Sequence, residues 1–97
     1  MADLRFDWDP RKAATNLAKH GVAFAEAITA FRDELALVLA DPDHSAIEAR
    51  FVLLGLSAER RVLVVVHCLR EAGEVIRIIS ARPASRRERT HYRERNS

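Results

Sequence analysis

Residues 75–82 read Val-Ile-Arg-Ile-Ile-Ser-Ala-Arg, and this stretch, rich in β-branched residues, predicts a strand near the C-terminus. Arg77 lies inside the apolar run and Arg82 ends it. Because a guanidinium keeps its charge, burying Arg77 without a partner would be costly. Arg77 therefore requires an acidic partner, a water-lined face or an anionic ligand, and which of these applies largely decides what the protein does.

Three more strand patterns precede this stretch. Residues 35–39, 47–56 and 61–69 are mainly apolar, and short turns at 41–45, 58–60 and 71–73 follow them. A further short strand is predicted at residues 5–8, where polar and apolar side chains alternate. Because strands joined by short turns pair antiparallel, we expect a meander sheet.

Helix signals flank these strands. Asp9 before Pro10 predicts an N-cap and a first helical position, and the helix should run to about residue 20, where Gly21 ends it. A second helix is expected over residues 24–31 from apolar side chains at helical spacing. Ser85 and the glutamate three residues later form a capping-box pattern that starts a last helix.

The order of these elements is β-α-α-β-β-β-β-α. It predicts an α+β fold, with an antiparallel meander sheet, two N-terminal helices on one face and a C-terminal helix. The chain has 97 residues, of which 48% are hydrophobic and 31% charged, and we expect one soluble domain over residues 1–97.

Several classes of protein are excluded by composition. The longest apolar run, Val62 to Val66, is far shorter than the ~18 residues of a membrane helix, and the N-terminus has no signal-peptide pattern. Cys68 is the only cysteine, which excludes an internal disulfide and fits a reducing compartment. We therefore expect a cytoplasmic protein without a membrane partner.

Charge is unevenly distributed along the chain. Residues 1–76 hold nine Lys or Arg against twelve Asp or Glu, a net of −3, whereas residues 77–97 hold seven Arg against two Glu, a net of +5. Arginine supplies fourteen of the sixteen basic residues, and its guanidinium binds phosphate and carboxylate in bidentate fashion. The C-terminal part is therefore expected to bind nucleic acid or an acidic partner.

Strand parity groups some of the basic residues. Arg61 and His67 are six residues apart on one predicted strand and therefore share a face. If the hairpin at residues 71–73 pairs His67 with Arg77, Arg77 joins that face, whereas a one-residue slip would remove it. We expect a ligand or partner on this cationic face, which would also carry Leu63, Val65 and Ile79, and a core face formed by Val62, Val64, Val66, Cys68, Ile76 and Ile78.

Taken together, three blocks of the sequence resemble the BrnT family of toxins, in the right order and over about nine-tenths of the chain. The first block has Phe6-Asp7-Trp8-Asp9-Pro10, Lys12, Ala13, Asn16, Leu17, Lys19-His20-Gly21-Val22 and Phe24. The second has Asp41, His44-Ser45, Glu48, Arg50, Gly55 and Ser57. The third has residues 61–67, 76–82, Ala84, Glu88 and Tyr92.

The resemblance implies a RelE-like ribonuclease toxin of a type II toxin–antitoxin system. It also implies a BrnA-like antitoxin with a ribbon-helix-helix DNA-binding domain, a complex of two toxins with two antitoxins, and contact with DNA only through the antitoxin. By the same resemblance, Arg61 and Arg77 are the first candidates for essential residues. The chain departs from the family at Ala23, where a capping Ser is frequent, and at Arg60, where Gly is common.

Metal-free RNA cleavage needs a base for the 2′-hydroxyl, cations for the phosphorane and an acid for the 5′-oxygen. Arg61, Arg77 and Arg82 suit phosphate binding and charge stabilisation. His67 is the best acid–base candidate by residue type, and Tyr92 is a weaker acid that could instead stack on a base. The histidines and Cys68 show no ligand spacing, so no metal or cofactor is expected.

The remaining candidates have structural alternatives. Arg77 could pair with a carboxylate such as Glu48, itself a candidate base, and His67 could be a structural histidine. Ser80 and Arg82 could bind RNA or tie down the strand end. On the last helix, Arg86 and Arg89 are candidate RNA contacts or part of a solvated face. Two other functions also fit, a non-catalytic nucleic-acid-binding module and a corepressor-like partner of an acidic peptide.

Overall fold

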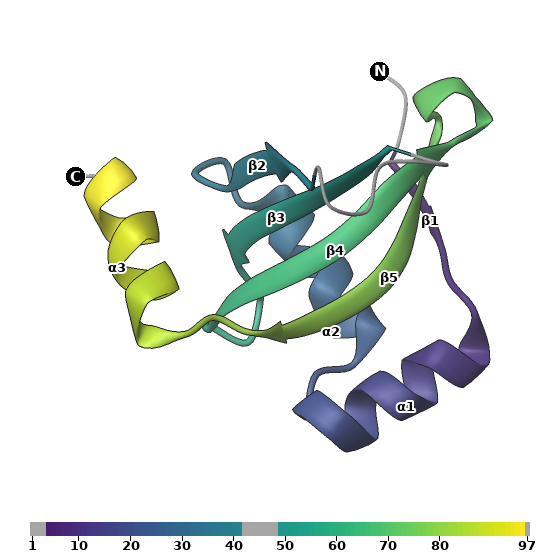
Figure 1. Cartoon of the computed structure of the whole chain (residues 1–97), viewed down its shortest axis with the longest axis horizontal. Coiled ribbons are helices and arrows are strands. Elements are labelled where there is room, and N and C mark those ends of the chain that lie inside the picture. The colour runs from purple at the N-terminus through teal and green to yellow at the C-terminus, as the bar shows by residue number, and fades with distance from the viewer. Residues whose placement is uncertain (1–3, 42–48, 97) are drawn as a thin grey trace.

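The computed structural model describes residues 4–41 and 49–96, which contain a five-stranded sheet in the order β1-β5-β4-β3-β2 (Figure 1). The strands are β1 (Arg5–Asp7), β2 (Leu37–Ala40), β3 (Arg50–Leu56), β4 (Val62–Arg70) and β5 (Val75–Pro83). Strands β2 to β5 form the predicted antiparallel meander. The prediction was wrong for β1, which pairs parallel with β5 and makes the sheet mixed. The reason is that β1 is followed by two helices and not by a hairpin turn, so no short turn makes it pair antiparallel.

The helices are α1 (Pro10–His20), α2 (Phe24–Thr29) and α3 (Arg86–Arg95), with single 3₁₀ turns at Ala30–Arg32 and Glu71–Gly73. The predicted caps are confirmed for α1 and α3. Asp9 accepts a hydrogen bond from the backbone N–H of Arg11, Gly21 adopts φ 70°, and Ser85 forms the capping box. Among the described residues, no helix has the length and hydropathy needed to cross a membrane.

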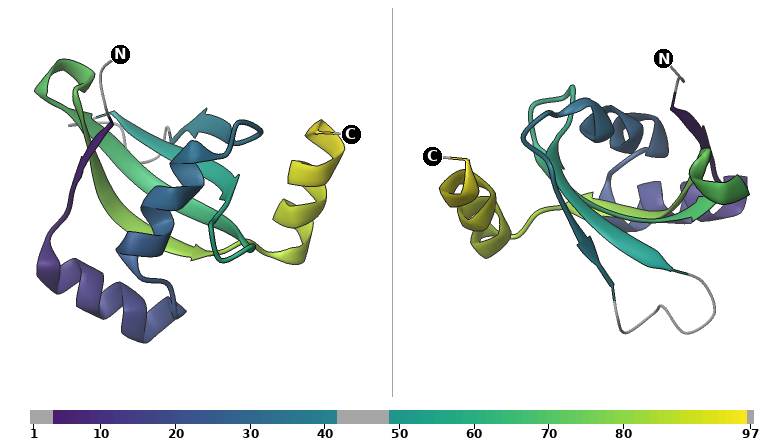
Figure 2. Two further views of the ribbon diagram at one scale, coloured as in Figure 1. Left: turned by 180° about the vertical axis from the view of Figure 1, so that it is seen from behind. Right: turned by 90° about the horizontal axis from the view of Figure 1, so that it is seen from above.

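The two faces of the sheet are covered unequally. Helix α2 lies behind it in Figure 1, α1 runs below it along the β5 edge, and α3 lies beside its other face, as Figure 2 also shows. We call the two sides the helix face and the open face. The helix face carries Phe51, Leu53, Leu63, Val65, His67, Ile76, Ile78 and Ala81, and the open face carries Arg50, Val52, Leu54, Val64, Val66, Cys68, Arg77, Ser80 and Arg82.

The main core lies on the helix face. Leu63, Val65 and Ile78 are almost fully buried there, against Phe24 and Ala27 of α2. A smaller core lies on the open face beneath α3 and consists of Leu54, Val64, Ala84 and Tyr92. Because α3 covers only this end, the rest of the open face carries no helix (Figure 1).

A bulge in the β4–β5 hairpin sets which residues share a face. Val66 pairs with Ser80, but His67 pairs with Ile78, so Ile79 has no counterpart on β4. Such an extra residue shifts the register by one position. Arg77 is therefore paired with Cys68, on the opposite face from His67.

The predicted assignment of the faces was right for Ile76 and Ile78, which lie in the main core, but wrong for β4. Leu63, Val65 and His67, which were expected on a ligand-binding face, belong to the buried helix face. Val62 and Val66, which were expected in the core, lie only half-buried on the other side. The alternation along each strand was right, but helix α2 covers the side that carries Leu63 and Val65.

Helix α1 completes an edge of β5. Strand β1 pairs only with residues 75–77, so the edge of β5 beyond them has no strand partner. The side-chain amide of Asn16 fills this gap, donating to the carbonyl of Ala81 (2.8 Å) and accepting from its N–H (3.0 Å). Asn16 also donates to the carbonyl of Val22 (2.9 Å). One buried amide thus replaces a strand and fixes α1 along β5.

Candidate functional site

Arg61 is held by three hydrogen bonds at the start of β4. Its guanidinium donates from Nε and Nη2 to the two carboxylate oxygens of Glu26 (2.8 and 2.6 Å), and Nη2 also donates to the carbonyl of Gly21 (2.8 Å). The Glu26 side chain is only 10% exposed and also accepts from the hydroxyl of Ser57. The hydrogen bonds from Arg61 lower the pKa of Glu26 against the effect of its burial.

This arrangement accounts for the departure at Ala23. Ala23 is the N-cap of α2 and has no side chain that can accept a hydrogen bond. The third residue of the helix, Glu26, would close a capping box, but here its carboxylate binds Arg61 instead. Arg61 thereby ties the start of α2 to β4 and to the end of α1.

His67 lies inside the main core. Its side chain is 4% exposed and packs edge-on against Phe31, with ring centroids 4.8 Å apart, and beside Phe51 at 5.9 Å. Its Nδ1 donates to the carbonyl of Val65 (3.1 Å), and burial lowers the pKa of the imidazole. A neutral, enclosed ring of this kind fills the core, so a catalytic role for His67 stays a prediction that this position does not favour.

Tyr92 anchors α3 to Asp33, in the segment before the edge strand β2. Its hydroxyl donates to Oδ2 of Asp33, which also accepts from the backbone N–H of Leu56. Burial and the hydrogen bond to Asp33 raise the pKa of Tyr92 to about 12. The Tyr92 side chain is 8% exposed and packs in the smaller core, and its catalytic role also stays a prediction.

Arg82 is tied to the start of α3. Its two terminal nitrogens donate to the carboxylate oxygens of Glu88 (2.7 and 2.9 Å), and Glu88 also closes the capping box with Ser85. The hydrogen bonds from Arg82 lower the pKa of Glu88 to about 2. On the same helix, Arg89 donates to the carbonyl of Ala84 (2.9 Å) and Arg86 is exposed.

Arg77 lies on the open face beside a second arginine that the sequence analysis left unassigned. Arg50 and Arg77 are both paired with Cys68, one from each side, so all three share the open face. Among the described residues, Arg77 makes one ion pair, 3.3 Å from Asp7 on β1. The Nε of Arg50 is buried and has no hydrogen-bond partner in the part of the chain that the structure describes. The alternative partner of Arg77, Glu48, lies outside the described residues.

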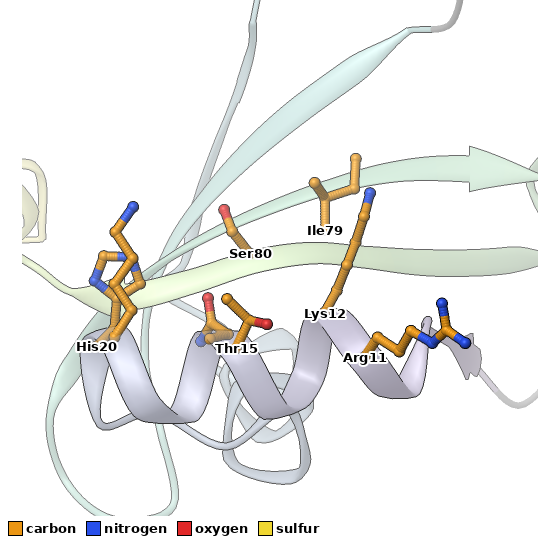
Figure 3. A pocket seen from close by; sticks show the side chains of 8 residues that line it. Arg11, Lys12, Thr15, His20, Ile79 and Ser80 are labelled. Atoms are coloured by element: carbon orange, nitrogen blue, oxygen red, sulfur yellow. The ribbon is translucent and has the colours of Figure 1, made fainter.

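A basic pocket between α1 and β5 is the feature that the sequence analysis missed. It has a volume of about 290 Å³ and is lined by Arg11, Lys12, Thr15, Asn16, Lys19, His20, Ile79 and Ser80. Figure 3 shows the side chain of Lys12 reaching across β5 beside Ile79, on the side to which the Ser80 hydroxyl points. The spacing of residues 12, 15, 16 and 19 on one helix face was the available signal.

A second hollow lies on the open face next to α3. It measures about 300 Å³ and is lined by Leu39, Val52, Leu54, Val64, Arg87, Glu88 and His91. Leu39 is 59% exposed, and the four aliphatic side chains form a floor beside the charged side chains of α3. This apolar groove adjoins Arg82, which binds Glu88.

The predicted site residues are thus divided between several places. Arg77, Ser80 and Arg82 follow one another along β5 on the open face, whereas Arg61 and His67 contact the helix side and Tyr92, on α3, packs in the smaller core. In the described ranges, 4–41 and 49–96, no group of three or more His, Cys, Asp or Glu side chains could hold a metal ion.

Comparison with known proteins identifies the class of protein that has this fold. A family model described as "Ribonuclease toxin, BrnT, of type II toxin-antitoxin system" matches residues 8–88. The chain is therefore a ribonuclease toxin of a type II toxin–antitoxin system, which implies RNA cleavage and a cognate antitoxin. Because the match covers most of the chain, the protein belongs to the BrnT family, as the resemblance predicted.

A solved structure supports the same conclusion. The crystal structure of the Brucella abortus ribonuclease toxin BrnT is similar to this chain with a TM-score of 0.67 and 28% sequence identity, over 87% of this chain and 100% of that one. No curated protein matches the chain. The predicted α+β fold is confirmed, with three helices and a mixed sheet in place of the purely antiparallel one.

Proposed function

We propose that the protein cleaves RNA without a metal ion on the open face of its sheet, with Arg77 as the central phosphate-binding residue. The observation that carries the proposal is the placing of Arg50 and Arg77 on either side of Cys68. Two strand spacings separate their Cα atoms by roughly 10 Å, a span that two long guanidinium side chains can bridge around one phosphate.

The electrostatics of this face support an anionic ligand. Within residues 4–41 and 49–96, Arg77 has one long ion pair, with Asp7, whose side chain is 48% exposed, and the Nε of Arg50 has no acceptor. The positive charges of these two guanidinium groups are thus poorly compensated within the described part of the chain, which favours an anionic ligand. Arg82 lies further along the same strand and adds a positive charge next to α3.

In the proposed reaction the 2′-oxygen attacks the adjacent phosphorus and loses its proton, and the 5′-oxygen leaves and gains one. The products are a 2′,3′-cyclic phosphate and a 5′-hydroxyl. Arg77 and Arg50 stabilise the extra negative charge of the phosphorane, a role that a metal would otherwise fill. A fixed donor of this kind contributes about 10²–10³ in rate. Ser80, Arg82, Arg86 and Arg89 are proposed to bind RNA next to this centre.

The direct test measures cleavage of single-stranded RNA by the purified protein in the presence of EDTA. We expect cleavage to persist with EDTA and to fall about 10²-fold or more in Arg77→Ala. The matched control is Arg32→Ala, which removes an exposed arginine from the 3₁₀ turn after α2. Equal cleavage by Arg77→Ala and wild type would refute the role of Arg77, and complete inhibition by EDTA would refute metal independence.

We further propose that the antitoxin is a BrnA-like ribbon-helix-helix protein and that the complex contains two copies of each chain. The apolar groove at Leu39, Val52, Leu54 and Val64 supports a protein partner, since it offers aliphatic surface beside a cationic helix. A partner in this groove would cover the open face and exclude RNA. DNA binding would then come through the antitoxin alone.

This part of the proposal has a separate test. The neighbouring reading frame should encode a short protein with a ribbon-helix-helix sequence pattern. Light scattering on the co-purified complex should give the mass of two toxins and two antitoxins. A neighbouring protein of another fold, or a complex of one toxin with one antitoxin, would contradict the proposed partner or its stoichiometry.

A further inference from the structure

We propose that the basic pocket between α1 and β5 binds a phosphate of the RNA strand, next to the phosphate that is cleaved on the open face. The proposal rests on the proposed ribonuclease function and adds a binding subsite to it. Its residues are Lys12, Lys19, Thr15 and Ser80, with Arg11 and His20 at the rim.

The chemistry of the lining is that of an anion site. The pocket has two lysines, an arginine and a histidine, and two hydroxyl groups, and none of its eight lining residues is acidic. Among the described residues, no ion pair is formed by Lys12, Lys19 or Arg11. Three uncompensated cations around one hollow repel one another, and a phosphate would relieve this repulsion.

The pocket is held in shape by the structure around it. Asn16, in the middle of the basic face of α1, bonds both backbone groups of Ala81 and so sets the distance between helix and strand. The bulge acts on the other wall. Consecutive residues of a regular strand point to opposite sides, but Ile79 and Ser80 both line this pocket, next to the register shift.

The position of the pocket favours RNA over other anions. Ser80 lies between Arg77 and Arg82 on β5, so a strand bound along the open face passes one of the residues that line the pocket. Figure 3 shows Lys12 crossing β5 at this point, which brings its ammonium to the edge of that path. A lysine is a flexible point charge that suits a backbone phosphate, whereas the guanidinium of Arg77 suits bidentate binding of the reacting one.

The test separates binding from cleavage by using a 2′-O-methyl RNA oligonucleotide, which lacks the attacking 2′-hydroxyl. Nuclear magnetic resonance of the labelled protein should show shifts of the Thr15 and Ser80 amides on titration. Affinity should fall about tenfold in Lys12→Gln/Lys19→Gln, and the slope of log affinity against log salt should decrease by about 0.7, because one phosphate contact is lost. Arg32→Gln is the control with one exposed charge removed.

Three outcomes test the phosphate subsite independently of whether the protein cleaves RNA. Unchanged affinity in the double lysine variant overturns the subsite, even if Arg77→Ala still loses cleavage. Shifts at Thr15 and Ser80 that are caused by an acidic peptide but not by the oligonucleotide also overturn it. If the oligonucleotide binds as expected but wild-type protein cleaves no RNA, the subsite is supported and the proposed function fails. Unfolding curves should match wild type, because both lysines are exposed.

Discussion

Arg61, which immediately precedes β4, and Arg77, on the neighbouring strand β5, have the same side chain, but their surroundings differ. Arg61 makes three hydrogen bonds of 2.8 Å or shorter, two of them to a Glu26 carboxylate that is 10% exposed. Arg77 has one ion pair of 3.3 Å with Asp7, which is about half exposed. The burial of the carboxylate partner, more than the arginine itself, separates a structural cation from one that is available to a ligand.

This difference changes how a loss of activity is to be interpreted. Removing Arg61 leaves a largely buried carboxylate without its cation, so a loss of activity would result from destabilisation of the fold. Removing Arg77 leaves Asp7 in contact with water, so a loss of activity would result from the missing phosphate-binding group in a protein that still folds. Measurements of stability and cleavage on the same variants therefore distinguish the two roles.

The largest effect is expected for Arg61→Ala. It leaves Glu26 with only Ser57 as a side-chain partner and removes the hydrogen bond to Gly21, so the free energy of unfolding should fall by about 2–3 kcal/mol. Urea unfolding followed by the fluorescence of Trp8, the only tryptophan, measures this loss. Arg61→Ala/Glu26→Gln should recover part of it, because the unpaired charge is gone. A stable but inactive Arg61→Ala would instead make Arg61 a residue of the site.

The second-largest effect on stability is expected for Tyr92, whose side chain, like that of Arg61, is hydrogen-bonded to a carboxylate. Tyr92→Phe removes the hydroxyl that binds Asp33 and should cost about 1.5 kcal/mol. Because Tyr92 is the only tyrosine, its phenolate absorbance is a direct probe. The titration midpoint should be near the pKa of about 12, and Asp33→Asn should lower it. Since the folded pKa is raised above 10.0, this stabilisation is complete below pH 10 and is lost as the pH rises toward 12.

A midpoint near the ordinary tyrosine value in the folded protein would contradict this account. Tyr92 would then be accessible to solvent, and its predicted role as an acid in cleavage would gain support. The hydrogen bond from Tyr92 that holds α3 against residues 33–35 would also be absent. The cleavage assay would show separately whether activity depends on it.

A great part of the fold could be predicted from the sequence, because the strongest signals are local. The Asp9-Pro10 start, the Gly21 end and the Ser85–Glu88 capping box each satisfy backbone groups within one helix turn. The strands followed from short apolar runs between turns. The parallel pairing of β1 could not be predicted in this way, since it depends on where α1 and α2 return the chain.

The grouping of the candidate residues on the two faces was predicted less well, because it depends on a single residue of register. Ile79 as the bulge places Arg77 beside Cys68 rather than beside His67, and no local pattern in the strand marks Ile79 as the extra residue. The two lysines of α1 were visible in the sequence, but only the Asn16 contact with Ala81 shows that they border β5. Arginine content alone could not separate paired from unpaired cations.

A smaller effect is expected at the end of β5, where Arg82 and Glu88 are both partly exposed. Glu88→Gln weakens the ion pair and the capping box and should cost about 1 kcal/mol at neutral pH. The folded pKa of Glu88 is about 2, below its ordinary 4.5, so this stabilisation is present above pH 4.5 and is lost as the pH falls toward 2. Stability curves of the variant and wild type should therefore converge in acid. A difference that stays constant down to pH 2 would assign the effect to another cause.

The smallest effect on stability is expected for Arg77→Ala, at about 0.5 kcal/mol or less, because its one ion pair is long and partly exposed. The same variant is expected to lose nearly all cleavage, and this contrast with Arg61→Ala is the sharpest test of the comparison. Arg77→Lys keeps the charge but not the bidentate geometry, so it should fold normally and cleave at an intermediate rate. If Arg77→Ala were as unstable as Arg61→Ala, Arg77 would be a structural cation too. Anion binding on the open face would then depend on Arg50 and on the lysines of α1.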